Sequence, residues 1–229
     1  MQHLILLHGA IGSKEQLEPL AQLLQNDFVV HTISFAGHGG NPVPNEPFSI
    51  ELFAHEVLNF MQQQNIEHAN IFGYSMGGYV GLYIAKNYSD KIIRLVTLAT
   101  KVQWDETIAA KEIKMMDAVT LEQKVPFFAA QLVKRHAPNN WKTVLQKAAE
   151  MLANLGRKNT LIIEDYSSIN APCLLLLGDR DKMVSLSETV AVYKQLPNAQ
   201  FAVLPNTSHP IEQVDTGLLV FIVKRFLKQ

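Results

Sequence analysis

The chain contains little cysteine and almost no net charge. Cys173 is the only cysteine among 229 residues, and the formal net charge is −1. A single cysteine cannot form an internal disulfide, and its place in an apolar run predicts a core residue rather than a nucleophile. A chain without a basic surplus has no field that would attract nucleic acid or an anionic membrane. We therefore expect neither partner, and the cysteine content favours a reducing cytoplasm.

Long hydrophobic runs are also missing. The apolar stretch at the N-terminus ends at His8, and no later stretch is long enough to span a bilayer. The first residues, Met1-Gln2-His3, carry no cationic leader, so we expect neither export nor membrane anchoring. Because 48% of the residues are hydrophobic, the chain can bury one sizeable core. These features predict one soluble globular domain.

The sequence lacks the spacing of the common nucleotide and metal motifs. Gly37, Gly39 and Gly40 do not fit the GxGxxG pattern of a dinucleotide-binding turn, and residues 12–14 lack the upstream glycine of a phosphate-binding loop. Five histidines show no metal-ligand spacing and are expected at the surface or in loops, namely His31, His38, His55, His68 and His136. We therefore expect no cofactor and no metal.

Short apolar runs alternate with amphipathic segments along most of the chain. The apolar runs predict strands at residues 3–7, 28–34, 71–74, 92–98, 172–177 and 200–204. The amphipathic segments predict helices at residues 15–24, 49–64, 76–87 and 210–227, and one that begins at the capping box of Ser185 and Glu188. Nearly every strand is apolar on both faces, which is typical of a parallel sheet covered by helices. The predicted fold class is α/β, doubly wound.

The alternation stops between residues 100 and 159. Three helical segments follow one another there without a strand, at 105–119, 126–136 and 140–155, and Gly156 is expected to end the third. The third segment carries one apolar stripe, which needs an apolar partner. We interpret residues 101–159 as a helical cap that is inserted into a core formed by residues 1–100 and 160–229.

The third apolar run ends in the pentapeptide Gly73-Tyr74-Ser75-Met76-Gly77. Between a strand and a helix, this pattern sets a serine on a tight turn, where its hydroxyl projects from the edge of the sheet. A side chain at Gly73 or Gly77 would collide with the neighbouring strand and helix. The positive end of the helix that follows would lie beside Ser75. On its own, the pentapeptide also fits a plain strand-to-helix turn.

Two polar sites follow later strands. Asp179 and Asp181 come directly after the fifth predicted strand, and His209 follows the sixth. Ligands of parallel sheets bind beyond the carboxyl ends of the strands, so we expect Ser75, one aspartate and His209 to share one crevice. A serine becomes nucleophilic when an imidazole takes its proton, and a carboxylate orients that imidazole. Loop length decides which carboxylate reaches His209, so Asp179 is an alternative to Asp181.

These motifs, in the order Ser, Asp, His, resemble those of the α/β-hydrolase fold superfamily. The resemblance covers essentially the whole chain, and its markers are His8-Gly9, Gly37-His38-Gly39, the segment from Gly73 to Gly78, Gly178-Asp179-Arg180-Asp181 and Ser208-His209. Two leading strands that are usual in the family are absent, because Met1 falls directly in the strand before His8. The resemblance therefore implies a wholly parallel sheet of six strands.

The resemblance also implies roles for individual residues. Ser75 would be the nucleophile and His209 the general base, and Asp181 would be the acid that orients the imidazole. The backbone N–H groups of Ala10 and Met76 would form the oxyanion hole, which stabilises the charge that develops on the substrate oxygen.

Three positions in the loops near this site depart from the family pattern. Ser34 and Asn41 flank the loop after the second strand, where the family often has aspartate and serine. Ser208 precedes the histidine, where glycine is usual. We expect these changes to alter loop contacts without moving the imidazole. His8 is expected to stabilise its own loop through hydrogen bonds rather than to touch substrate.

Together these patterns predict a cofactor-independent serine hydrolase that acts on small-molecule esters, thioesters or related acyl compounds through an acyl-enzyme. A C–C bond hydrolase or lyase with the same three residues is one alternative. It would need a cation in the pocket, which Lys101, Arg135 or Arg180 could supply. A slow-turnover ligand-binding receptor on the same fold is a second alternative, because the triad alone does not set the reaction.

The predicted cap is expected to fold over the crevice. Some of its large apolar side chains should line an acyl pocket, and the candidates are Trp104, Ile108, Met115, Val119, Phe127, Phe128, Leu132 and Trp141. Trp104, at the cap entrance, is the main candidate, with packing against the core as the alternative. The pairs Met115-Met116 and Phe127-Phe128 are expected to pack within the cap rather than to contact a ligand specifically.

Overall fold

The computed structural model describes residues 1–229 and has one six-stranded sheet at its centre. The strands are β1 (His3–Leu7), β2 (Val29–Ile33), β3 (Ala69–Tyr74), β4 (Ile92–Leu98), β5 (Cys173–Gly178) and β6 (Ala199–Leu204). Their order in the sheet is β2-β1-β3-β4-β5-β6, and every neighbouring pair is parallel. The predicted α/β fold with a wholly parallel six-stranded sheet is confirmed.

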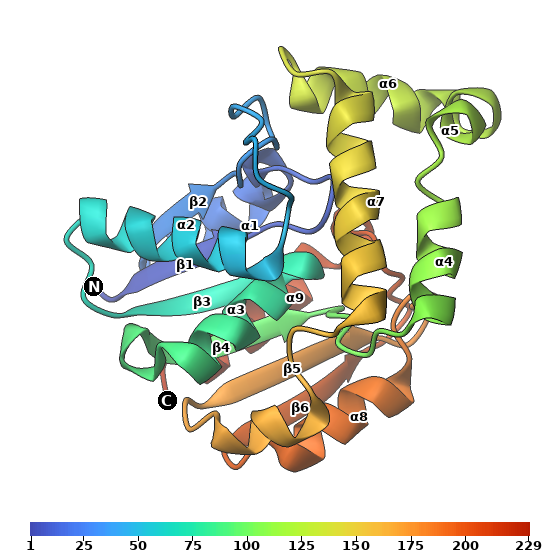
Figure 1. Cartoon of the computed structure of the whole chain (residues 1–229). Coiled ribbons are helices and arrows are strands. Elements are labelled where there is room, and N and C mark those ends of the chain that lie inside the picture. The colour runs from blue at the N-terminus through green and yellow to red at the C-terminus, as the bar shows by residue number, and fades with distance from the viewer.

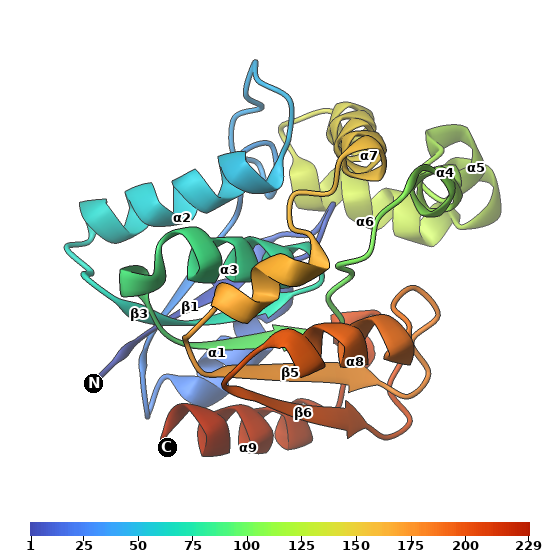
Figure 2. The same cartoon turned by 60° about the horizontal axis from the view of Figure 1, so that its bottom comes forward.

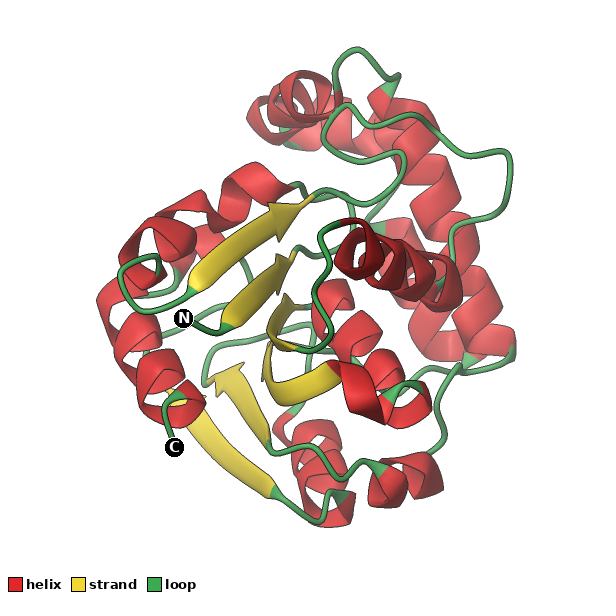
Figure 3. Cartoon of the chain, turned by 90° about the vertical axis from the view of Figure 1, so that its left-hand side faces the viewer, coloured by secondary structure: helices red, strands yellow, loops and turns green.

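Helices cover both faces of this sheet, because alternate side chains of each strand point to opposite faces. On one face, Leu4 and Leu6 pack with α1 (Glu18–Leu24) and α9 (Thr216–Leu227). On the other face, Ile5 and Leu7 pack with helices α2 (Ile50–Gln63), α3 (Met76–Asn87) and α8 (Leu186–Gln195). Figure 2 has α2 and α3 above the sheet and α9 below it, and Figure 3 shows the strands between the helices.

Two predicted helices begin later than expected. The segment at 15–24 is a 3₁₀ turn at Lys14–Leu17 followed by α1. Pro19 lies in the first turn of α1, where its missing N–H group is tolerated, and a helix from residue 15 would have needed that donor. At the C-terminus, α9 starts at Thr216 because Asp215 caps it, with Oδ1 accepting from the Leu218 N–H at 2.9 Å.

The chain between β4 and β5, residues 99–172, is called the inserted segment below. It contains four helices rather than the three predicted, namely α4 (Glu106–Lys114), α5 (Ala118–Lys124), α6 (Pro126–His136) and α7 (Trp141–Arg157). The expected helix at 105–119 is broken because the Asp117 carboxylate accepts from the Thr120 N–H at 2.7 Å and starts α5. Figure 1 shows these helices beyond one end of the sheet.

Gly156 does not end α7, contrary to the sequence prediction, because the helix continues to Arg157. Helices α4 and α7 lie side by side (Figure 1). A Cβ atom added at Gly156 would lie 2.6 Å from Cβ of Ala109 and 2.9 Å from the carbonyl oxygen of Asp105. The glycine therefore permits the close approach of α7 to α4. None of the helices combines the length and the apolar character that a membrane crossing requires.

Candidate active site

Ser75 lies on a strained turn between β3 and α3. Its φ of 51° falls in the left-handed region, which is uncommon for a residue with a side chain. The turn is tight on both sides, since a Cβ atom at Gly73 would lie 2.3 Å from the Gly77 oxygen, and one at Gly77 would lie 2.3 Å from the Leu7 oxygen. The backbone N–H of Ser75 donates to the Leu98 carbonyl at 2.8 Å, which ties the turn to β4.

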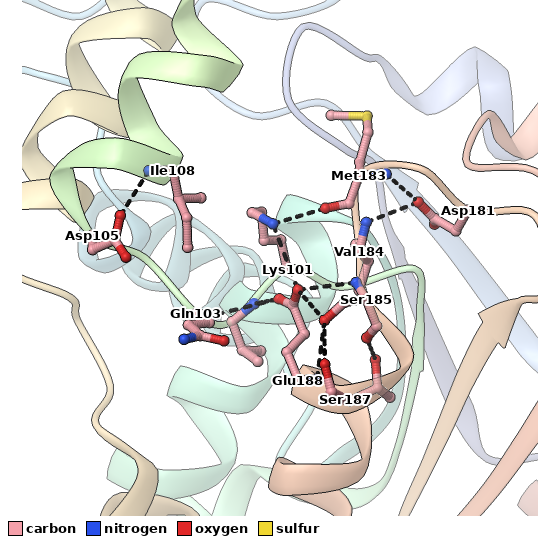
Figure 4. A network of polar contacts seen from close by, with 12 residues as sticks. Lys101, Gln103, Asp105, Ile108, Asp181, Met183, Val184, Ser185, Ser187 and Glu188 are labelled. Carbon is pink, nitrogen blue, oxygen red and sulfur yellow. Dashed lines mark hydrogen bonds and ion pairs between the residues drawn. The ribbon is translucent and has the colours of Figure 1, made fainter.

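His209 and Asp181 lie beside this serine, as the sequence predicted. The Nε2 atom of His209 is 3.3 Å from Ser75 Oγ, and its Nδ1 atom is 2.8 Å from Asp181 Oδ2. Asp181 follows β5 and His209 follows β6, so both side chains come from loops at the carboxyl edge of the sheet. The other oxygen of Asp181 accepts from the N–H groups of Met183 and Val184, at 2.8 and 2.9 Å (Figure 4).

These contacts set the charge of Asp181 and the tautomer of His209. Burial raises the pKa of the Asp181 carboxyl, but the hydrogen bond and charge of His209 and the two backbone donors outweigh it, so the net shift is downward. An ionised carboxylate can only accept, so the His209 Nδ1 atom carries the hydrogen of that bond. The Nε2 atom then faces Ser75 with a free lone pair, which can accept the serine proton.

Asp179 has a different set of partners. Its Oδ1 atom accepts from the Thr207 N–H at 3.0 Å, and this bond and a second one from Asn206 lower its pKa. The side chain is exposed, and the two ring nitrogens of His209 pair with Asp181 and Ser75 instead. Asp179 therefore stabilises the loop that precedes His209, while Asp181 binds the imidazole itself.

The two expected oxyanion donors adjoin the serine. Ala10 and Met76 line the same cavity as Ser75 and His209. Met76 is the first residue of α3, so its backbone N–H has no acceptor within the helix. Neither Ala10 nor Met76 donates a backbone hydrogen bond outside the regular elements. Both N–H groups are thus available to an oxygen atom bound next to Ser75.

The loop beside Ala10 is held by the inserted segment. Ile11 has a φ of 51°, an outlier for a β-branched residue, and its carbonyl accepts from Arg135 Nη1 and His136 Nε2, both at 3.1 Å. The Nδ1 atom of His136 accepts from the Gly39 N–H at 3.3 Å. Burial lowers the pKa of His136 to about 4, so the ring is neutral and bridges two loops. The expected surface or loop position for His136 is wrong, since it is buried at the end of α6.

His8 is fully buried and stabilises its own loop, as predicted. Its Nδ1 atom donates to the Gly9 carbonyl at 2.7 Å, and its Nε2 atom accepts from the Phe35 N–H at 3.1 Å. Burial lowers the pKa of this imidazole to about 3, so the ring is neutral. His38, also buried, lies beside it with ring centroids 5.1 Å apart.

A cavity of about 260 Å³ opens at Ser75 between the sheet core and the inserted segment, and 13 of its 17 lining residues are hydrophobic. Among the side chains expected to line it, Trp104, Met115 and Phe128 do so. Met116 lines it too, so the Met115-Met116 pair and Phe128 are not merely packed within the inserted segment. Phe127 is 77% exposed. The cavity is therefore apolar, with walls from both parts of the chain.

One of the three candidate cations reaches this cavity. Lys101 lines it, but its ammonium donates to the Met183 carbonyl at 2.7 Å and lies 3.5 Å from Glu188 Oε2 (Figure 4). Arg135 is engaged with Ile11, and Arg180 is exposed. The charge of Lys101 is therefore balanced within the protein.

Two further expectations concern cysteine and metals. Cys173 is buried in β5, and burial raises the pKa of its thiol to about 12, which makes it a core residue. No group of three or more histidine, cysteine, aspartate or glutamate side chains is arranged to hold a metal ion.

Comparison with known proteins agrees with this architecture. A model of the alpha/beta hydrolase fold family matches residues 2–137. The esterase YbfF of Escherichia coli K12 is 26% identical over 98% of this chain and 92% of its own length. The 2-(acetamidomethylene)succinate hydrolase of Mesorhizobium japonicum is 20% identical over 98% of this chain and 87% of its own.

Solved structures show the same fold. The thermophilic esterase of Thermogutta terrifontis superposes with a TM-score of 0.80 at 19% identity, covering 100% of this chain and 90% of that one. MenH of S. aureus gives a TM-score of 0.80 at 21% identity, covering 99% and 93%. The matched family segment spans more than half of the 229 residues. The chain therefore belongs to the α/β-hydrolase fold family.

Proposed function

We propose that this protein is a cofactor-independent serine hydrolase of small-molecule esters, thioesters or related acyl compounds. The observation that carries the proposal is the position of the His209 ring, 3.3 Å from Ser75 Oγ on one side and 2.8 Å from Asp181 on the other. This is the arrangement in which an imidazole activates a serine hydroxyl. The esterases among the distant relatives support the same reaction class.

In the proposed reaction, Ser75 Oγ attacks the acyl carbonyl while His209 Nε2 takes its proton. The Ala10 and Met76 N–H groups stabilise the negative oxygen of the tetrahedral intermediate. His209 then gives the proton to the leaving group, and an acyl group remains on Ser75. Water, deprotonated by the same imidazole, attacks this acyl-enzyme, and His209 returns the proton to Ser75 Oγ as the bond to the acyl group breaks and the acid leaves. Asp181 stays ionised and supports the imidazolium formed in each half.

We further propose that residues 101–159 act as a cap on a core formed by residues 1–100 and 160–229. The shared cavity supports this division, because side chains from both parts surround the same space beside Ser75. An acyl group attached to Ser75 would then lie between the two parts, in contact with Trp104, Met115 and Phe128. The apolar walls favour an acyl chain of several carbons.

A C–C bond hydrolase or lyase is the second candidate. Lys101 favours it, because it is the one lysine or arginine that lines the cavity. However, Glu188 and the Met183 carbonyl already hold the Lys101 ammonium. An anionic substrate would have to compete for that charge, so the structure favours ester or thioester hydrolysis.

A fluorophosphonate probe tests the nucleophile. We expect one covalent label on Ser75, together with steady hydrolysis of p-nitrophenyl butyrate. Ser75→Ala should remove the label and lower kcat by about 10⁴–10⁶. Ser167→Ala, which changes an exposed serine, is the control and should keep both. An adduct that peptide mass spectrometry finds on another serine would overturn the assignment, and a single slow turnover would favour a receptor.

A further inference from the structure

Glu112 is the polar side chain of the cavity lining whose interactions within the protein do not explain its presence. The four polar residues that line the cavity are Ser75, His209, Lys101 and Glu112. The first two contact each other, and Lys101 is paired with Glu188. Glu112 is 3% exposed, takes part in none of the ion pairs, and its Oε2 atom has no hydrogen-bond partner. The cavity is thus lined by one carboxylate side chain for which the structure gives neither an ion pair nor a hydrogen bond.

The place of Glu112 on α4 makes its polarity unusual. Ala109 precedes it by one turn and is also buried, so both face α7 along the buried stripe of the helix. A hydrophobic side chain would fill this position without a desolvation cost, whereas a buried carboxylate without a partner destabilises the fold. A residue that breaks the local pattern in this way, inside a cavity, is typical of a functional position.

Trp104 contributes a second unused polar atom. Its indole Nε1 atom is buried without a hydrogen-bond partner, and the residue lines the same cavity. Binding cavities are mostly apolar and carry a few polar groups that orient the ligand. Here Glu112 and Trp104 are lining residues that each carry a buried polar atom without a protein partner, beside Ser75, His209 and Lys101.

We propose that Glu112 is a specificity-determining residue, which accepts a hydrogen bond from an N–H or O–H group carried on the acyl part of the substrate. This inference rests on the proposed hydrolase function and names its substrate class. Hydroxyl and amide groups suit the cavity because each can give a hydrogen to Glu112 and accept one from Trp104. The substrate is then a hydroxyacyl or amidoacyl ester or thioester, rather than a plain fatty acyl compound.

Matched p-nitrophenyl esters test this selectivity. Hexanoate is compared with 6-hydroxyhexanoate, 6-acetamidohexanoate and 6-aminohexanoate, and butanoate with 4-acetamidobutanoate. We expect kcat/KM of wild type to be at least about tenfold higher for a hydroxy or acetamido ester than for the alkyl ester of equal length. Glu112→Met should reverse this preference, changing the ratio by about 10²-fold.

Two further variants test whether the preference for hydroxy and acetamido esters comes from the hydrogen-bond acceptor of Glu112 or from its charge. Glu112→Gln keeps an amide acceptor and should retain the preference for hydroxy and acetamido esters, while losing any preference for the ammonium of the amino ester. Glu106→Met changes an exposed glutamate of the same helix and should leave every ratio unchanged. Thermal unfolding checks the fold, and we expect no loss of Tm for Glu112→Met, because the substitution removes an unpaired buried carboxylate.

A binding measurement keeps the inference testable without turnover. Calorimetry compares N-methylhexanamide with N-methyl-6-hydroxyhexanamide, neither of which offers an ester. We expect tighter binding of the hydroxylated amide to wild type and equal or weaker binding of it to Glu112→Met. If no ester is hydrolysed but this difference is present, the proposed reaction fails and the Glu112 site stands. If Glu112→Met leaves both the kinetic and the binding ratios unchanged, the inference is overturned.

Discussion

In the sheet core, the polar side chains that face the cavity are held by neighbouring groups, whereas two that face it from the inserted segment are not. His209 is fixed between Ser75 and Asp181, and Asp181 is fixed by two backbone N–H groups. Glu112 and Trp104 each present an atom without a partner. Under the proposed function, the core would define the reacting geometry, and Glu112 and Trp104 of the inserted segment would pair with polar groups of the substrate.

The two regions also differ in how they are built. The proposed reacting groups of the core lie on short loops that follow parallel strands of one sheet, and short loops restrict the positions of these groups. The helices α5 and α6 instead pack around a small cluster that includes Leu132 and Trp141. Phe127 and Val119 of these helices are exposed. Substitutions in the core should therefore change the rate of the chemistry, and those in the inserted segment should change which substrates are used.

The largest expected effect is a loss of kcat, and it tests the role of the sheet core. Asp181→Asn should lower kcat by about 10³–10⁴, because an amide no longer fixes the His209 tautomer that can accept the Ser75 proton. Asp179→Asn is the matched control on the same loop, and we expect a much smaller change, because Asp179 holds only the Thr207 backbone. Steady-state kinetics on one ester decide between them. A larger loss in Asp179→Asn would transfer the role to that residue.

Acid should weaken the fold at the contact between the two regions. The pKa of His8 is lowered to about 3, chiefly by burial, so the unfolded chain binds this proton at higher pH than the folded chain does. The free energy of unfolding should be unaffected by His8 above about pH 6.5 and should fall below it by about 1.4 kcal/mol per pH unit. His136, with a pKa lowered to about 4, acts in the same direction.

Urea unfolding at pH 7.5, 6.0 and 5.0 measures this slope. We expect the dependence on pH to be flatter in His8→Asn, by up to about 1.4 kcal/mol per pH unit, even though the variant is less stable at pH 7.5. His136→Gln should flatten it by nearly as much, since a folded-state pKa of about 4 also lies below this whole pH range. An unchanged slope in both variants would show that these two imidazoles do not govern acid stability.

The smallest expected effect tests the inserted segment. Each methylene that enters the cavity should raise kcat/KM by about 0.8 kcal/mol, roughly fourfold, until the acyl chain reaches its wall. Trp104→Ala should move the best chain length of p-nitrophenyl alkanoates upward by one or more carbons, without abolishing hydrolysis. Phe127→Ala is the control and should change nothing, because Phe127 is 77% exposed. The same optimum in wild type and Trp104→Ala would remove Trp104 from the acyl wall.

Local signals were enough to predict the core half of the site. Ser75, Asp181 and His209 each follow a short apolar strand, and parallel strands bring such loops to one edge, so the structure brings together the side chains that the sequence singled out. The start of α2 could also be predicted, because Ser49 accepts from the N–H of Leu52, three residues along the chain. These features depend on neighbours in sequence or on the sheet topology alone.

The contacts that the sequence does not predict depend on how helices far apart in the chain pack. Glu112 is buried only because α7 lies against α4, and its sequence context resembles that of an exposed helical glutamate. Arg135 and His136 look like ordinary residues at a helix C-terminus, where basic side chains are common. The sequence predicts a helix end at Gly156, whereas the structure places this glycine at the contact between α4 and α7. The residue pattern of one helix does not predict which other helix will pack against it.

The two hydrogen bonds that Arg135 and His136 donate to the Ile11 carbonyl join helix α6 of the inserted segment to the loop that carries Ala10. If α6 moved away from the core, the Ile11 carbonyl would lose both hydrogen bonds. These bonds support the left-handed backbone conformation of Ile11, which is unfavourable for a β-branched residue. Ala10, the candidate oxyanion donor, precedes that residue in the chain. Movement of α6 away from the core would therefore remove this support from the loop that carries Ala10, so the position of α6 and the conformation of that loop are coupled.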